Sequence, residues 1–392
     1  MRKSISKRIA LFLLAGLCAV PAGCGSRNDT RIIAFVGDTS TGEYYEICQE
    51  LWQGVSAYAT ESGEEATIYT PDDPTVAGVR RGMLSAIEDG ADVIVCVGDE
   101  MANAVYDLQQ QERETEFILI DGIPTDGSGS GKSRIRGNTY SIVFNREEAG
   151  FLAGYAAVME GYRQIGFLGG SAGSDDRRYG SGFVQGAEAA GTALGYTEGE
   201  VDIRYRLTTS NAISPTLVSQ IGEWFEEGCE LICVCGSGPE FVGPEAAGQY
   251  GGRVITADMN RLEDSSSTIA ASGINHIAVV QLALKGLDEG TLKGGRKNVF
   301  GLADGGVSMK LRDDMFEQFT QEDLDRIAEA IGSGEIEVTS SDVVENPEKY
   351  EIAICRITGI ETEEEEAGEE DASVQTESES EADAGEAQDS TN

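Results

Sequence analysis

The stretch FNREEAGFLAGYAAVMEGYRQIGFLGGSAGSDDRRYGSGFVQG, residues 144–186, decides the fold. Its first part predicts a helix, because apolar side chains recur at helical spacing and Asn145 suits the N-cap before an acidic first turn. Gly150 and Gly154, with the alanines beside them, leave room for another backbone to approach. We therefore expect this helix to pack closely against a neighbouring element.

The rest of the stretch supplies the other parts of an open α/β sheet. The apolar run 165–168 predicts a buried strand, and 169–171 is a glycine turn. We place the next helix at 181–194 and interpret the charged cluster 175–178 as a solvated loop. Sheets built from such units bind ligands at the carboxyl ends of their strands.

The same order of elements occurs twice along the chain. EDGADVIVCVGDE at 88–100 and EEGCELICVCGSG at 226–238 both run from acids and a glycine through a buried strand into a polar glycine turn. This repetition predicts two Rossmann-like lobes of the α/β class with a hinged ligand cleft between them. A further helix is expected at 272–287. The expected lobes are 31–143 with 273–303 returning to it, and 144–272 with 304–360.

Length and charge exclude several classes of protein. The 392 residues suffice for two core-forming domains, and 69 acidic against 29 basic residues give a formal net charge of −40. Much of this charge lies in 361–392, whose composition predicts a disordered tail. An acidic chain without a basic face is a poor candidate for binding nucleic acid.

The N-terminus has the features of a secretion signal. Basic residues precede an apolar run at 9–20 that is too short for a membrane span, and Pro21-Ala-Gly-Cys24 follows. The last three residues resemble a bacterial lipobox. We expect a signal peptide at 1–23, lipidation of Cys24, and a tether at 24–30. The alternative is plain secretion with cleavage near Ala22.

The six later cysteines are interpreted as small buried residues. Cys229, Cys233 and Cys235 have a spacing that suggests a metal site, but their strand-like alternation and the lack of a nearby histidine argue against it. We expect no disulfide framework, although a bond through Cys229 stays open.

Polar residues recur where the predicted strands end, and we expect them to meet in the cleft. Carboxylates there suit neutral hydroxylated ligands, because each oxygen accepts hydrogen bonds, whereas phosphates require lysines and free helix N-termini. One such acid alone is equally well explained as a turn or helix cap; their recurrence in both lobes favours ligand binding. These candidates are Asp38, Gly98, Asp99, Asp121, Gly236 and Asp258.

Aromatic side chains near these strand ends could stack on a planar ligand. Tyr44 and Tyr45 lie on or beside the first loop, and both packing and ligand stacking are open to them. For Trp52 and Phe183, which fall on helix faces, packing is the favoured role and ligand stacking the alternative.

No constellation of catalytic residues is apparent. His276 is the only histidine and is expected to be solvated or packed, no H-E-x-x-H occurs, and the turn 169–173 lacks the lysine of a P-loop. We expect neither an enzyme nor a bound cofactor or metal.

Several motifs resemble the basic membrane protein family, the nucleoside-binding lipoproteins that serve ABC importers. They are FNREEAGFLAGYAA (144–157), IGFLGG (165–170), ITADMN (255–260) and GLADGGV (301–307). The resemblance covers essentially 31–360 and implies a type I periplasmic-binding-protein fold, with three segments crossing between the lobes.

The resemblance also implies roles for single residues. Asp258 would hold ribose hydroxyls, and aromatic side chains of the two lobes would enclose the base. Asn260 stands where the family has a second acid and Asn275 where it has a lysine, while Asp38-TSTGEYYEIC replaces the family's D-x-S-F-N segment.

The leading hypothesis is therefore an extracytoplasmic, lipid-anchored receptor of an ABC importer. It would bind a nucleoside, with purines favoured, and act as a monomer that delivers the ligand to a permease. The alternatives are a sensor for a membrane signalling partner and a receptor for a sugar-like ligand.

Overall fold

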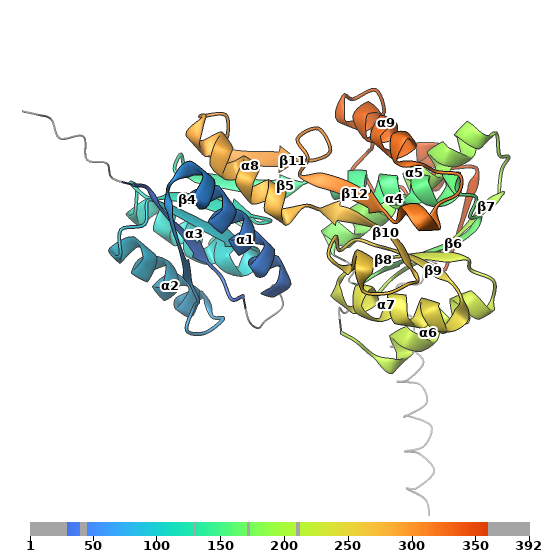
Figure 1. Ribbon diagram of the computed structural model, residues 1–392, viewed down its shortest axis with the longest axis horizontal. Coiled ribbons are helices and arrows are strands. Elements are labelled where there is room, and N and C mark those ends of the chain that lie inside the picture. The colour runs from blue at the N-terminus through green and yellow to red at the C-terminus, as the bar shows by residue number, and fades with distance from the viewer. Residues whose placement is uncertain (1–29, 40–44, 129–130, 171–172, 209–211, 360–392) are drawn as a thin grey trace, which may run out of the picture.

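The computed structural model describes residues 30–39, 45–128, 131–170, 173–208 and 212–359. Two lobes lie side by side and are joined by crossing segments (Figure 1). No helix within the described residues is long and apolar enough to cross a membrane. The predicted signal peptide, Cys24, Tyr44 and the acidic tail lie outside these residues.

The first lobe contains a six-stranded parallel sheet with the order β11-β5-β4-β3-β1-β2. Successive residues of its strands point to opposite faces, so one face packs on α1 and α8 and the other on α2 and α3. The elements are β1 (Ile32–Val36), α1 (Tyr45–Ser62), β2 (Glu65–Tyr69), α2 (Val76–Glu88), β3 (Val93–Val97), α3 (Asp99–Gln111), β4 (Glu116–Ile120), β5 (Thr139–Phe144), α8 (His276–Asp288) and β11 (Arg296–Phe300).

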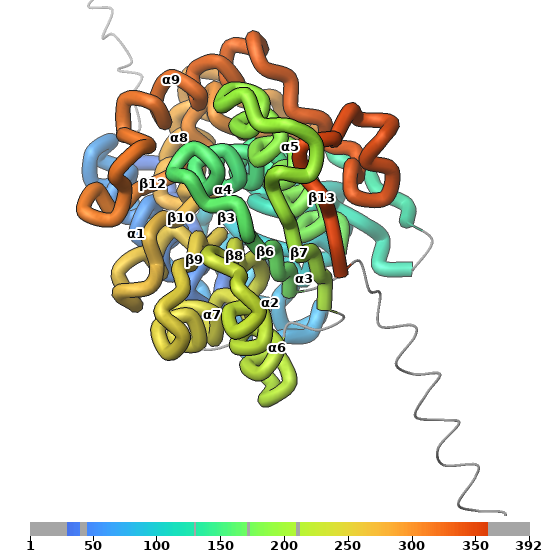
Figure 2. Tube along the Cα trace, turned by 90° about the vertical axis from the view of Figure 1, so that its right-hand side faces the viewer, coloured from blue at the N-terminus to red at the C-terminus, as the bar shows by residue number. Residues whose placement is uncertain are grey.

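The second lobe contains a seven-stranded sheet with the order β12-β10-β9-β8-β6-β7-β13, parallel except for β12. One face packs on α4, α5 and α9, and the other on α6 and α7. Figure 2 shows β13 alongside β7 at one edge. The elements are α4 (Arg146–Met159), β6 (Gln164–Gly169), α5 (Ser174–Leu194), β7 (Val201–Leu207), α6 (Pro215–Glu226), β8 (Leu231–Cys235), α7 (Ser237–Tyr250), β9 (Arg253–Thr256), β10 (Thr268–Ile274), β12 (Val307–Leu311), α9 (Gln321–Gly332) and β13 (Cys355–Thr358).

Three segments connect the sheets, after β5, after β10 and after β11. Hydrogen bonds join them in pairs: the Asn145 amide donates to the Phe300 carbonyl at 2.9 Å, and the Asn275 amide to the Gly306 carbonyl at 3.1 Å. The Glu148 carboxylate accepts from Asn145 Nδ2 at 2.6 Å and from the Leu302 amide at 2.7 Å. The three crossings are therefore linked to one another by hydrogen bonds. The predicted α/β class with parallel sheets is confirmed.

Helices α4 and α5 cross unusually closely, because each presents glycines to the backbone of the other. A Cβ atom on Gly150 or Gly154 would lie 1.9 or 2.0 Å from a carbonyl oxygen of α5. A Cβ atom on Gly182 or Gly186 would lie 2.0 Å from a carbonyl oxygen of α4. The expectation that Gly150 and Gly154 admit another backbone is confirmed, and the partner is α5.

Two predicted helix boundaries are wrong. Helix α5 begins at Ser174, so residues 175–178 are helical rather than a loop; the acids of its first turn favour that start. The predicted helix 272–287 begins only at His276, because Thr268–Ile274 is a fully buried strand that runs beside β9.

Helix α7 was not predicted from the sequence. Its sequence contains Pro239, Pro244 and three glycines, which disfavour a helix locally. Burial of Val242, Ala246 and Ala247 against the second sheet supplies the stabilisation that local propensity lacks. The six later cysteines are buried and free, as predicted.

We predict that Gly154→Ala destabilises the protein by about 1–3 kcal/mol, because the new methyl group meets the Phe183 carbonyl carbon and oxygen, which belong to a helix and cannot shift alone. The matched control is Gly248→Ala in α7, where a Cβ atom meets nothing within 4 Å. This control should be neutral or stabilising by up to about 1 kcal/mol. Equal denaturation midpoints for the two variants would contradict the close crossing.

Candidate ligand-binding cleft

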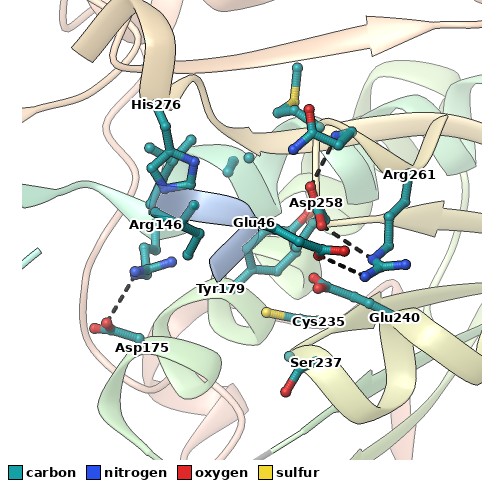
Figure 3. A pocket seen from close by; sticks show the side chains of 18 of the residues that line it. Glu46, Arg146, Asp175, Tyr179, Cys235, Ser237, Glu240, Asp258, Arg261 and His276 are labelled. Carbon is teal, nitrogen blue, oxygen red and sulfur yellow. Dashed lines mark hydrogen bonds and ion pairs between the residues drawn. The ribbon is translucent and has the colours of Figure 1, made fainter. Parts of the chain in front are cut away.

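A cavity of about 340 Å³ lies between the lobes, at the carboxyl ends of both sheets. The first lobe contributes Glu46 and Glu50 from α1, Asp121 after β4, and His276 from α8. The second lobe contributes side chains from the starts of α4, α5 and α7 and from the segment after β9 (Figure 3). These are Arg146, Asp175, Asp176, Tyr179, Glu240, Asp258, Asn260 and Arg261.

The lining is strongly acidic. Seven of its residues are carboxylates, whereas two are arginines and one is a histidine. Both arginines are already paired with carboxylates, so neither is an available partner for an anionic ligand. The cleft therefore suits a neutral or cationic ligand that donates hydrogen bonds.

Arg146, the first residue of α4, connects the lobes next to the first crossing segment. Its Nη2 atom lies 2.6 Å from Asp121 Oδ2 at the end of β4, and its Nε atom lies 3.0 Å from Asp175 Oδ2 in α5. Burial alone would lower the pKa of the guanidinium, but the two carboxylates outweigh it and the pKa is raised. The glycine crossing of α4 and α5 places Arg146 and Asp175 together.

Asp258 follows β9 and is held on the second lobe by its neighbours. Its Oδ1 atom accepts a hydrogen bond from the Asn260 amide at 2.9 Å, and its Oδ2 atom lies 3.2 Å from Arg261 Nε. Burial raises the pKa of Asp258, while the Asn260 amide and Arg261 act in the opposite direction. Its carboxylate thus faces the cavity in a fixed orientation.

Glu240, in the first turn and a half of α7, has a strongly shifted pKa. Burial is the main cause of the shift, and the nearby negative charge of Asp258 raises the pKa further. The positive charge of Arg261 offsets part of this rise, and the pKa of Glu240 is raised to about 8. A substantial fraction of this carboxyl group is therefore protonated at neutral pH and can donate a hydrogen bond into the cavity.

Several other polar groups of the lining interact within the protein. The Tyr179 hydroxyl donates to the Ser272 carbonyl at 2.8 Å, and Cys235 Sγ donates to Asp176 Oδ1 at 3.5 Å. His276 Nδ1 lies 2.7 Å from Glu50 Oε2. Among the described residues no group of histidine, cysteine, aspartate and glutamate side chains is arranged to hold a metal ion.

Four of the residues proposed from sequence line the cavity, namely Asp121, Gly236, Asp258 and Asn260. Asn275 lies next to it as the N-cap of α8, where its Oδ1 atom accepts from the Ala278 amide at 3.2 Å. Asp38, Gly98 and Asp99 end neighbouring strands of the first lobe without lining the cavity, although Asp99 lies within electrostatic range of Asp121 and Asp175. Tyr45 is 37% exposed, and its hydroxyl donates to Glu46 Oε1 at 2.8 Å.

Phe183 has the packing role, and the alternative that it contacts the ligand is wrong. Its side chain is fully buried in the second lobe, with its ring centroid 5.8 Å from that of Phe167. It cannot stack on a ligand in the cleft, because the inward face of α5 must fill the core. Trp52 also packs inward, with its ring centroid 6.4 Å from that of Phe35.

Several residues that line the cavity were not predicted from the sequence. Glu46, Arg146, Tyr179 and Glu240 each lie near the start of a helix, and Arg261 follows Asp258 by three residues. An acidic first turn after a glycine loop, as at Asp175, is the one local signal that could have indicated them.

Comparison with known proteins identifies the family. Residues 42–342 match the family of PnrA-like ABC transporter substrate-binding proteins. The chain belongs to this family. The resemblance to basic membrane proteins is thereby confirmed, and the family consists of solute-binding proteins rather than enzymes.

Curated relatives are distant. The chain is 25% identical over 246 residues to basic membrane protein B of Borreliella burgdorferi, a match that covers 60% of this chain and 68% of that protein. It is 22% identical over 213 residues to the CD4+ T-cell-stimulating antigen of Listeria innocua. That match covers 50% of this chain and 56% of the antigen, so the chain spans about half the length of this relative.

Solved structures share the fold. A solute-binding protein of an ABC transporter system from Conexibacter woesei aligns with a TM-score of 0.61 at 15% identity, over 79% of this chain and 99% of that one. A solute-binding protein from Aeropyrum pernix aligns with a TM-score of 0.60 at 17% identity, over 82% and 97% of the two chains. These likenesses show that the chain shares the two-lobed fold of these structures.

We predict that Glu240→Gln changes the pH dependence of stability. Because the pKa of Glu240 is higher in the folded state than its ordinary value of 4.5, the native protein binds the extra proton. This stabilising contribution is fully present below about pH 4.5 and is lost as the pH rises toward about 8. At pH 8–9 the free energy of unfolding of the variant should therefore exceed that of the wild type by on the order of 1 kcal/mol, which corresponds to a few degrees in Tm. This figure allows for the partial exposure of Glu240 to solvent.

Thermal unfolding curves between pH 5 and pH 9 test this expectation. Glu245→Gln, which removes an exposed carboxylate from the same helix, is the matched control and should follow the wild type. Parallel curves for Glu240→Gln and the wild type would contradict the raised pKa.

Proposed function

We propose that the protein is the receptor of an ABC importer and binds a nucleoside, with purines favoured, between its two lobes. The observation that carries the proposal is the position of Asp258. This carboxylate ends β9, lines a cavity between lobes of a substrate-binding family, and lies beside Asn260. A carboxylate accepts bonds from two vicinal hydroxyls, as a ribose presents them.

The charge of the cleft supports a nucleoside rather than a nucleotide. The charged carboxylates of the lining repel phosphate, and the two arginines are occupied by ion pairs. The cavity, at about 340 Å³, falls in the size range of small-molecule sites.

Recognition of the base would rely on hydrogen bonds more than on stacking. Tyr179 is the one aromatic residue among the described lining residues, and its side chain is 2% exposed. Carboxylates such as Glu50 and Asp176 can accept bonds from the ring N–H and amino groups of a purine, and a protonated Glu240 can donate to a ring nitrogen or a carbonyl oxygen.

Transport would depend on closure of the lobes. Both lobes present polar groups to one cavity and share a hinge of three crossings, so a ligand that bridges them stabilises the closed form. The permease would recognise that form. The protein would be held outside the cell by a lipid on Cys24. β1 begins at the amino-terminal ends of the strands, so the described chain enters the first lobe on the side opposite the cleft.

Calorimetric titration of the purified protein with adenosine, guanosine, inosine, ribose and AMP tests the proposal. We expect nucleosides to bind and AMP to bind at least about tenfold more weakly, because phosphate meets the unneutralised carboxylates. Asp258→Asn should weaken nucleoside binding by about tenfold or more, as expected for a lost charged hydrogen-bond acceptor.

Asp314→Asn serves as the control, because this aspartate side chain is 75% exposed on the second lobe and does not line the cavity. Binding of ribose or another sugar in place of every nucleoside would refute the nucleoside proposal. Nucleoside binding that Asp258→Asn leaves unchanged would refute the assigned contact.

A further inference from the structure

Arg261 joins the two lobes across the cavity. It follows β9 in the second lobe, and its Nη2 atom donates a hydrogen bond to Glu46 Oε2 in the first lobe at 2.9 Å. The two residues are 215 positions apart in the sequence and share no secondary structure element. Their contact therefore exists only when the lobes approach each other.

A second ion pair between the lobes, that of Asp121 and Arg146, differs from this contact. Asp121 and Arg146 follow β4 and β5, which are neighbouring strands of one sheet. Their contact can persist at many lobe angles, because both lie next to the hinge. The contact between Glu46 and Arg261 depends on the angle itself.

Each member of the pair is positioned by its own lobe. Glu46 Oε1 accepts a hydrogen bond from the Tyr45 hydroxyl at 2.8 Å, which leaves Oε2 for Arg261. On the second lobe, Arg261 Nη1 donates to Asp264 Oδ2 at 3.4 Å, and its Cζ atom lies 5.6 Å above the ring centroid of Phe241. Little reorganisation is needed when the two side chains meet.

The Arg261 guanidinium makes different kinds of contact with Glu46 and with Asp258. The bond to Glu46 is an aligned hydrogen bond, whereas Arg261 Nε lies 3.2 Å from Asp258 Oδ2 and is buried without a hydrogen-bond partner in the described structure. The guanidinium is thus turned toward the first lobe. Asp258 keeps the nearby positive charge while its Oδ2 atom stays available to another donor.

We propose that Glu46 and Arg261 form a clasp that holds the lobes together before ligand binds and frees Asp258 for the ligand. Arg261 acts as a positioning residue, because it orients the Asp258 carboxylate and does not itself replace the ligand contact. When the lobes part, Arg261 loses Glu46 and turns to Asp258. The clasp rests on the proposed function only in the identity of the ligand.

The distance between the lobes in the ligand-free protein tests the clasp directly. Spin labels on cysteines introduced at Gln53 in α1 and Glu245 in α7, both exposed, report this distance by pulsed electron resonance. Glu46→Gln should shift the distance distribution toward longer values. Asp264→Asn should shift the distribution much less, because it removes a carboxylate from the same guanidinium within the second lobe and leaves the bond to Glu46 in place.

Nucleoside affinity supplies the second measurement. Glu46→Gln should weaken binding about three- to tenfold, less than Asp258→Asn, and the effects of Glu46→Gln and Arg261→Gln should be non-additive because they remove one interaction. Arg261→Lys, which keeps the charge, should restore part of the affinity that Arg261→Gln loses.

The outcomes separate the clasp from the proposed ligand. Unchanged distances in Glu46→Gln, or equal changes in Glu46→Gln and Asp264→Asn, would overturn the clasp whatever the protein binds. A shift specific to Glu46→Gln in a protein that binds no nucleoside would support the clasp and refute the proposed ligand. If the protein binds nucleosides but the effects of Glu46→Gln and Arg261→Gln on affinity add fully, the proposed ligand would be supported and the clasp refuted.

Discussion

The close crossing of α4 and α5 is the constraint on which the binding cleft depends. Four glycines bring the two helix backbones into contact, and any Cβ atom at these positions would overlap a carbonyl oxygen. Both helices start at the cleft, so their approach fixes where Arg146, Asp175 and Tyr179 enter it. A change of helix separation would move all three side chains relative to β9 and Asp258. Packing inside one lobe therefore sets the geometry of a site between two lobes.

The segments that connect the two lobes lie directly beside this crossing of helices. Asn145 precedes α4, and Glu148, one turn later, accepts hydrogen bonds from Asn145 and from the third crossing segment. Burial raises the pKa of this carboxyl group, although the Leu302 amide and Asn145 favour its charged form. The same short segment thus ends one sheet, begins the glycine crossing and ties the crossings together. The backbone connections between the lobes therefore lie directly beside the tightly packed helix pair.

Because the cleft is strongly acidic, the ion pairs within it are important for its charge balance. Each arginine of this acidic site contacts more than one carboxylate, and its loss would leave partly buried carboxylates unpaired. Because Arg146 and Arg261 contact carboxylates of both lobes, charge balance in the cleft is linked to the angle between the lobes. Glu240 relieves the remaining repulsion in another way, by retaining a proton near neutral pH.

Local sequence determined much of this architecture. Buried strands appear as short apolar runs, the glycines of α4 recur at a spacing of four, and polar residues follow the strands that end at the cleft, as at Asp121 and Asp258. These features depend on neighbours along the chain, which is why periodicity reveals them. Helix α7 shows the limit, because packing on the sheet overrides two prolines that argue against it.

Only the tertiary structure decided which side chains meet. It buried Phe183 in the core, started α5 early enough to bring Asp175 and Tyr179 into the cleft, and placed Arg261 against Glu46. No local pattern encodes a contact between residues 215 positions apart, since it depends on strand order, on the helix crossing and on the angle between the lobes. The sequence by itself determined a two-lobed α/β protein with acids at its strand ends, and the folded chain determined how those acids are paired.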